Sequence, residues 1–194
     1  DGATYINGSQ VLATDVMASN RTVHVIDKVM IATGVDIVQS AIALQSAQVF
    51  VNPELSYLVE AVLYADLAGA LTASDGSPSF TVFAPSDQAF VDLGAALGLT
   101  FTEPADIRQL PVEVVTNVLL NHVVANDGKF TPELSEGTIT PLGGDNLSLG
   151  AFTNGTLTVT GVGNGGEVAN MVIPDVQTTN GVVHVIDRGL LPNL

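Results

Sequence analysis

A block of five residues, Val-His-Val-Ile-Asp, occurs at residues 23–27 and returns at residues 183–187. The two occurrences are 160 residues apart, and the similarity around them extends without gaps on both sides. Solenoid repeats recur every ~20–50 residues, so an offset this long is that of a whole domain. We therefore predict that residues 1–34 are the C-terminal remnant of a preceding domain plus a linker. Residues 35–194 are then one complete copy.

The composition excludes several classes of function. Five basic residues against twenty acidic ones give a net charge of −15, so the phosphates of nucleic acids would be repelled. No apolar run approaches the ~18–20 residues that span a membrane, and no cysteine is present for thiol chemistry or disulfides. The dispersed acidic residues are typical of a solvated, outward-facing surface. We expect a secreted or anchored protein, extracellular or on the cell surface, that neither binds nucleic acid nor inserts into membranes.

Capping residues and prolines predict several helices in the first half of the complete copy. A polar residue before an apolar-periodic segment, or a proline in its first turn, is a helix start signal. The predicted starts are Asp36, Asn52-Pro53, Pro85-Ser86-Asp87, Pro104 and Pro111. The second helix is expected to run to about Leu67 and the third to about Leu97, with a short strand at residues 80–83 between them.

The sequence pattern of the second half is typical of a β-sheet. From Gly137 onward, Thr, Val and Leu alternate between glycine-containing turns, which is typical of antiparallel strands. The candidate strands are residues 147–149, 156–160, 168–173 and 182–186. Helices followed by a sheet predict an α+β domain.

Three segments carry a resemblance to a known family. Residues 80–90, FTVFAPSDQAF, closely resemble the first signature segment of the fasciclin domain family, and residues 180–187, NGVVHVID, resemble the second. Residues 119–124, LLNHVV, lie where that family has its Tyr-His motif. The resemblance implies a wedge-shaped, antiparallel or mixed β-sheet flanked by N-terminal helices. It also implies tandem copies, a role in adhesion, and neither enzymatic activity nor a cofactor.

The same resemblance implies candidate partner-binding residues. In animal members, integrin-contacting segments lie around an Asp-Ile pair before the second signature and around the Tyr-His motif. The matching positions here are Asp175-Val176 in the complete copy, Asp15-Val16 in the remnant, and Asn121-His122. Valine follows both aspartates and Asn121 takes the place of the tyrosine. We therefore expect a protein or glycan partner at a cell surface or matrix rather than an integrin specifically.

The residues that could form a catalytic or metal site each have a simpler structural interpretation. His122 and His184 lie inside apolar runs, which favours buried, hydrogen-bonded rings over catalytic bases. Ser86 has no Gly-x-Ser-x-Gly setting and suits a helix cap better than a nucleophile. No calcium-loop pattern occurs among the acidic residues. We predict no catalytic residue, no metal and no cofactor.

Two functions from different classes follow. The first is a non-enzymatic adhesion or protein-interaction module, and the alternative is a carrier or receptor for a small apolar ligand. A ligand-sized apolar cavity would favour the carrier, whereas a closed core with Asp175 exposed would favour adhesion. Because Val23 and Val25 would form an unpaired apolar strand, we also expect residues 1–31 to dock on the complete copy or to mediate homo-association.

Overall fold

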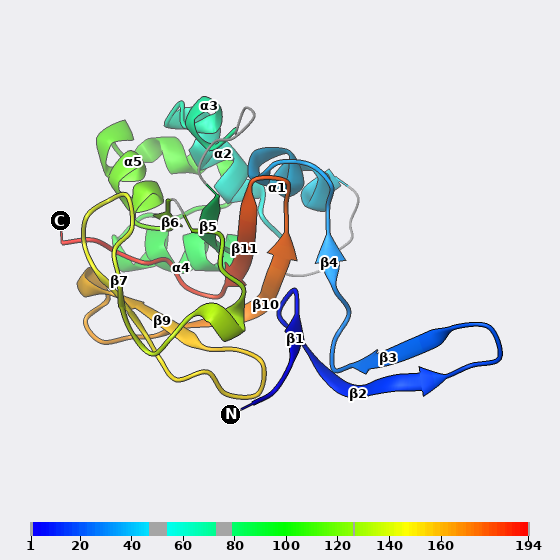
Figure 1. Ribbon diagram of the computed structural model, residues 1–194. Helices are drawn as coiled ribbons and strands as arrows, with labels where there is room; N and C mark the ends of the chain where they lie inside the picture. The colour runs from blue at the N-terminus through cyan, green and yellow to red at the C-terminus, as the bar shows by residue number, and fades with distance from the viewer. Residues whose placement is uncertain (1, 47–53, 73–78, 126, 194) are drawn as a thin grey trace.

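The computed structural model describes residues 2–46, 54–72, 79–125 and 127–193, and is built around a mixed sheet (Figure 1). The strands follow one another in the order β6-β5-β11-β10-β9-β8-β7, and β4 also pairs with β10. Two pairings are parallel, β11 with β5 and β10 with β4, and the others are antiparallel. Their bounds are β4 (Ile31–Ala32), β5 (Phe80–Pro85), β6 (Val123–Val124), β7 (Gly137–Ile139), β8 (Leu147–Leu149), β9 (Thr158–Gly161), β10 (Ala169–Gln177) and β11 (Gly181–Ile186).

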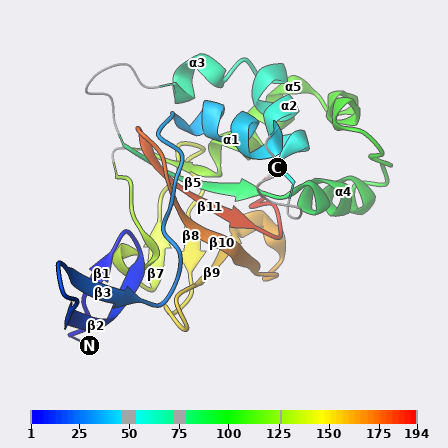
Figure 2. The ribbon, with the colours of Figure 1, turned by 90° about the vertical axis from the view of Figure 1, so that its right-hand side faces the viewer.

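The helices gather on one side of the sheet, as Figure 2 shows. The α-helices are α1 (Ile37–Ser46), α2 (Ser56–Tyr64), α3 (Ala68–Leu71), α4 (Asp87–Ala96) and α5 (Val112–Leu120). Short 3-10 helices are η1 (Pro104–Gln109), η2 (Thr131–Glu133) and η3 (Val162–Asn164). The predicted α+β class and the flanking helices are confirmed.

The first two predicted helices have different outcomes. Asp36 caps α1 as expected, because its Oδ1 accepts the amide hydrogen of Gln39 at 2.8 Å. The predicted start at Asn52-Pro53 lies outside the described residues. The second helix ends at Tyr64 rather than near Leu67, since Asp66 has a left-handed φ of 55° that an α-helix cannot continue through.

The predicted cap at Ser86 is only half right. Ser86 does occupy the position before α4, but its side chain makes no capping hydrogen bond. Asp87 caps a different helix, because its Oδ1 accepts the amide hydrogen of Tyr57 at 2.9 Å in the first turn of α2. Its other oxygen accepts from the hydroxyl of Ser56. The first signature segment therefore ties two helix starts together.

The two central strands are buried on both faces. Val82, Val183 and Val185 belong to a core beneath the helices, whereas Phe83 and Ile186 belong to a second core with β7, β8 and β9. A strand covered on both sides is apolar throughout rather than alternating, which explains the continuous apolar runs in β5 and β11. The wedge thus has one core on each side of its central pair.

A separate three-stranded sheet projects from the base of the domain (Figure 1). It consists of β1 (Tyr5–Ile6), β2 (Ser9–Met17) and β3 (Thr22–Ile26). We call β2 with β3 the N-terminal hairpin, and β10 with β11 the closing hairpin.

The N-terminal hairpin repeats the geometry of the closing hairpin. Val11 faces Ile26 as Met171 faces Ile186, and the later pairs follow at the same offset with bulges in the same places. Asp15 and Asp175 lie in these bulges with left-handed φ values of 56° and 65°. In each hairpin the amide of the aspartate donates to Nδ1 of the facing histidine, at 3.3 and 3.1 Å. The sequence repeat is therefore a structural repeat.

Candidate functional site

Asp175 lies at the centre of a buried polar cluster. It is only 4% exposed, and its carboxylate accepts two hydrogen bonds of 2.7 Å from Thr131, one from the amide and one from the hydroxyl. Both donors belong to the loop that leads into η2, so the carboxylate ties that loop to the bulge in β10. An aspartate held in this way is part of the domain interior rather than an exposed contact residue.

Lys28 brings a positive charge to this carboxylate from the segment between β3 and β4. Its Nζ lies 2.5 Å from Oδ2 of Asp175, and it follows directly after the N-terminal hairpin. Gly8 lies on the same oxygen so closely that a Cβ there would come within 2.1 Å of it, and its φ of +78° also favours glycine. The base of the N-terminal hairpin is thus fitted against Asp175.

His184 completes the cluster as a neutral ring. Burial lowers its pKa more strongly than the nearby Asp175 carboxylate, 3.8 Å away, raises it. Nδ1 accepts the amide hydrogen of Asp175, so Nε2 carries the proton and donates to the carbonyl of Lys129 at 3.0 Å. The histidine therefore does not neutralise the aspartate, and Lys28 does.

His122 and Asn121 form a second buried polar pair where α5 ends. Burial lowers the pKa of His122 from 6.5 to about 4. Its Nε2 accepts the amide hydrogen of Leu190 at 2.8 Å and Nδ1 lies 2.6 Å from the carbonyl of Val118. The amide nitrogen of Asn121 donates to the carbonyl of Leu190 at 3.1 Å. The pair thus fastens the segment after β11 to the end of α5.

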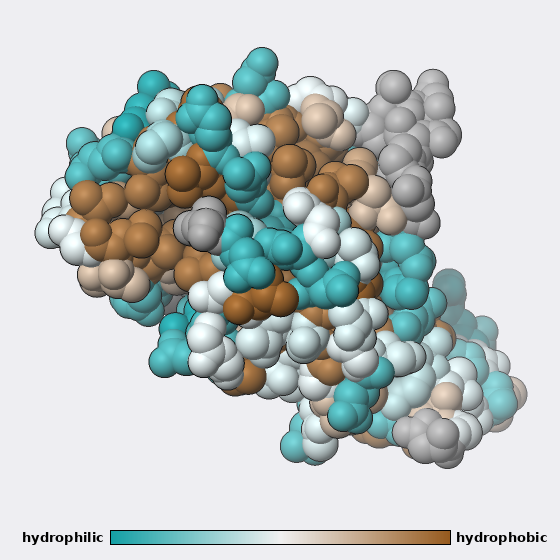
Figure 3. Space-filling model, turned by 90° about the vertical axis from the view of Figure 1, so that its left-hand side faces the viewer, coloured by the Kyte–Doolittle hydropathy of each residue, from teal (hydrophilic) through white to brown (hydrophobic). Residues whose placement is uncertain are grey.

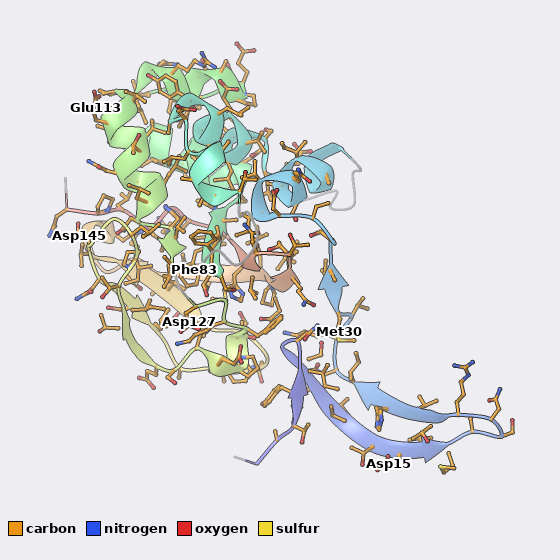
Figure 4. The ribbon with its side chains drawn as sticks, turned by 45° about the horizontal axis from the view of Figure 1, so that its top comes forward. Asp15, Met30, Phe83, Glu113, Asp127 and Asp145 are labelled. Carbon is orange, nitrogen blue, oxygen red and sulfur yellow. The ribbon has the colours of Figure 1, made fainter. Side chains whose placement is uncertain are left out.

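The structure separates the predicted partner-binding residues into two groups. Asp175, Val176, Asn121 and His122 are all buried, so the exposure that the binding hypothesis required of Asp175 is absent. Asp15 and Val16 are exposed on the N-terminal hairpin, and Figure 4 shows Asp15 far out on it. Sequence reasoning missed Lys28 and Thr131. The one available signal was that a basic residue follows both copies of the repeated block, as Lys28 and Arg188.

The buried histidines have no nitrogen left for catalysis. All four ring nitrogens of His122 and His184 are occupied by backbone groups, so neither ring is free to take a proton from Ser86. Within the described residues, no group of three or more His, Asp or Glu side chains is placed to hold a metal ion.

An apolar cavity lies between α1, α2, α5 and the central strands. It is lined almost entirely by apolar side chains, among them Val38, Ile42, Val59, Leu63 and Leu120. Its volume is about 70 Å³, well below the ~300–1,000 Å³ of typical ligand pockets. Figure 3 shows apolar residues gathered over the helical half of the face it presents. The cavity as it stands would admit only a small apolar group.

The domain defined by this geometry is an α+β wedge. Its buried polar groups are hydrogen-bonded within the fold, and its closing hairpin is repeated in an N-terminal extension. A profile described as "Fasciclin domain" matches residues 1–32 and 53–192. The chain belongs to the fasciclin domain family.

Relatives and solved structures agree with this assignment. Protein sll1483 of Synechocystis sp. is 34% identical over 142 residues, which is 73% of this chain and 69% of that protein. Human periostin is 27% identical over the whole chain, which spans only 20% of the length of periostin. A FAS1 domain pair from the insect cell adhesion molecule Fasciclin I has the same fold. Its TM-score is 0.62 at 19% identity, over 95% of this chain and 61% of that one.

The predicted family and wedge-shaped fold are confirmed. Among the described residues, no helix is both long and apolar enough to cross a membrane.

Proposed function

We propose that this chain is a non-enzymatic, extracellular protein-interaction module of a protein with several fasciclin copies. The observation that carries the proposal is that the polar atoms of the buried histidines and of Asp175 make hydrogen bonds within the fold. These groups therefore stabilise the domain rather than face a substrate. Membership of a family that includes an insect cell adhesion molecule supports the same function. Residues 1–34 are, in this proposal, the end of a preceding copy and its linker.

The partner is a protein or glycan at a cell surface or in a matrix, and the exposed candidates for contact are Asp15 and Val16. The other four candidates would have to leave the core to touch a partner. The apolar-ligand alternative has less support, because its cavity is several times smaller than a typical ligand pocket.

Immobilised protein tests this function against cells, matrix proteins and a glycan array. The proposal expects saturable binding to at least one class, which Asp15→Ala together with Val16→Ser weakens at least fivefold. Asp127→Ala is the matched control, because it removes an acidic side chain that is also exposed, on the domain body. The proposal fails if no class is bound, or if hydrolysis of a generic ester depends on Ser86.

A further inference from the structure

The closing hairpin shows what the free edge of the N-terminal hairpin fits. One edge of β11 pairs with β10, and the other pairs in parallel with β5 from Gly181 opposite Phe80 to Ile186 opposite Pro85. β3 pairs with β2 in the register that β11 uses with β10, but the other edge of β3 meets no strand of the described residues. Unpaired backbone groups along such an edge are a template for another strand.

The valines that the two hairpins share differ in their exposure. Val183 and Val185 are 5% and 0% exposed, whereas their counterparts Val23 and Val25 are 47% and 44% exposed. Val172 and its counterpart Leu12 are exposed in both hairpins, so this position does not distinguish them. The face of the N-terminal hairpin that carries Val16, Val23 and Val25, here called its inner face, therefore lacks the cover that the closing hairpin has.

The cover in the complete copy comes from the domain body. Val183 and Val185 pack with residues of β5 and the helices, and Ile186 packs beside Phe83 in the second core. Leu190, which follows the strand, is fully buried and donates its amide hydrogen to His122. Its counterpart Met30 is largely exposed at the junction between the hairpin and β4 (Figure 4).

We propose that the inner face of the N-terminal hairpin, defined by Val16, Val23 and Val25, is the docking surface for a preceding fasciclin body. That body presents a strand of the β5 type, which pairs in parallel with the free edge of β3. The inference rests on the proposed function, since it names one partner of the interaction module, and that body would cover Val16 as Val176 is covered in the complete copy. Asp15 and Val16 are then open to a cell-surface or matrix partner only in a chain without the docked body. A second copy of this chain is not that partner, because its own β5 is already paired with its own β11.

Lys28 helps to hold the N-terminal hairpin in a fixed position on the complete copy. The ion pair with Asp175 and the hydrogen bond of 2.7 Å from Asn7 to the side chain of Gln177 hold the base of the N-terminal hairpin against β10. In this arrangement Val23 and Val25 stay exposed, and among the described residues no strand pairs with the free edge of β3. Residues 1–32 would complete one domain while being fastened to the next.

The test extends the full chain at its N-terminus with residues 35–160 of the same sequence, which keeps the 160-residue offset. If the proposal holds, calorimetry shows two unfolding transitions, and Val25→Asp removes one of them while leaving the other in place. Leu12→Asp is the matched control on the same hairpin, because the counterpart Val172 is exposed even where the hairpin is covered, and both transitions should survive it.

A second extended protein shows whether the added body can fold at all when its own closing hairpin is present. It carries the sequence of residues 169–187 in place of residues 9–27, so that the added body meets its own closing hairpin. The proposal is overturned if this second protein shows two transitions and the first one shows only one. It is also overturned if Val25→Asp changes neither transition.

Sedimentation of the unextended chain tests whether a second copy of this chain binds the inner face instead. We expect a monomer, and a dimer abolished by Val25→Asp would make a second copy the partner and overturn the proposal. These measurements use folding and mass rather than attachment, so they separate failure of this inference from failure of the adhesion function.

Discussion

The carboxylate of Asp175 is held by two donors from Thr131 and by the ammonium group of Lys28. Removing one partner of such a pair leaves a buried charge without compensation, which is more costly than losing an exposed ion pair. Since Thr131 belongs to the domain and Lys28 follows the N-terminal hairpin, only the second interaction joins the two parts.

Lys28→Met should therefore loosen the hairpin as well as destabilise the protein. We expect a loss of about 1–3 kcal/mol, because the lysine is partly exposed. Spin labels on Ser19→Cys and Glu113→Cys can be placed in a chain that has no cysteine, and electron resonance then gives the distance distribution between them. Lys28→Met should broaden it, whereas Lys129→Met, which breaks a more exposed ion pair with Asp127, should not. Equal distributions in all three proteins would remove Lys28 from this role.

His122 should make stability depend on pH. Its pKa is lowered to about 4 in the folded protein, so the unfolded chain binds a proton first as the pH falls. The stability that the neutral ring contributes is complete above the unfolded pKa of about 6.5 and is lost between there and about 4. We expect urea denaturation to show about 2–3 kcal/mol more loss between pH 7 and 4.5 in the wild type than in His122→Gln. Parallel pH profiles would contradict this.

At the scale of elements, the sequence predicted well what depends on local signals. The caps and prolines located α1, α4 and α5, and the short segments of Thr, Val and Leu between glycine-containing turns located β8 and β11. It could not predict that Asp87 caps α2, because that contact spans 30 residues. Likewise, the binding hypothesis required an exposed Asp175, although the fold buries this aspartate under Thr131 and Lys28.

Equivalent strands should respond differently to one substitution. Val185→Ala should cost about 2–3 kcal/mol, because it removes buried methyl groups and leaves a cavity in the core beneath the helices. Val25→Ala should cost less than about 0.5 kcal/mol, because that side chain faces water in this chain. Urea denaturation of both variants gives the comparison. A similar cost at both positions would mean that β3 is already covered.

At the scale of the whole molecule, we propose that the chain is one fasciclin domain with the last hairpin of another. The offset of 160 residues predicted this division, and the matching registers and bulges support it. What the sequence could not predict is the joint, since the approach of Gly8 and Lys28 to Asp175 exists only after the complete copy has folded.

Amide hydrogen exchange at His24 tests most directly whether the N-terminal hairpin completes a preceding domain. In β11, the carbonyls of Asn180 and Ile186 accept from Phe80 and Ser86, so every second residue, including His184, faces β5. The counterpart of His184 in β3 is His24. We predict fast exchange at His24 in the chain alone, and exchange slowed at least a hundredfold when residues 35–160 precede it. Fast exchange at His24 in both chains, with His184 protected throughout, would contradict this prediction.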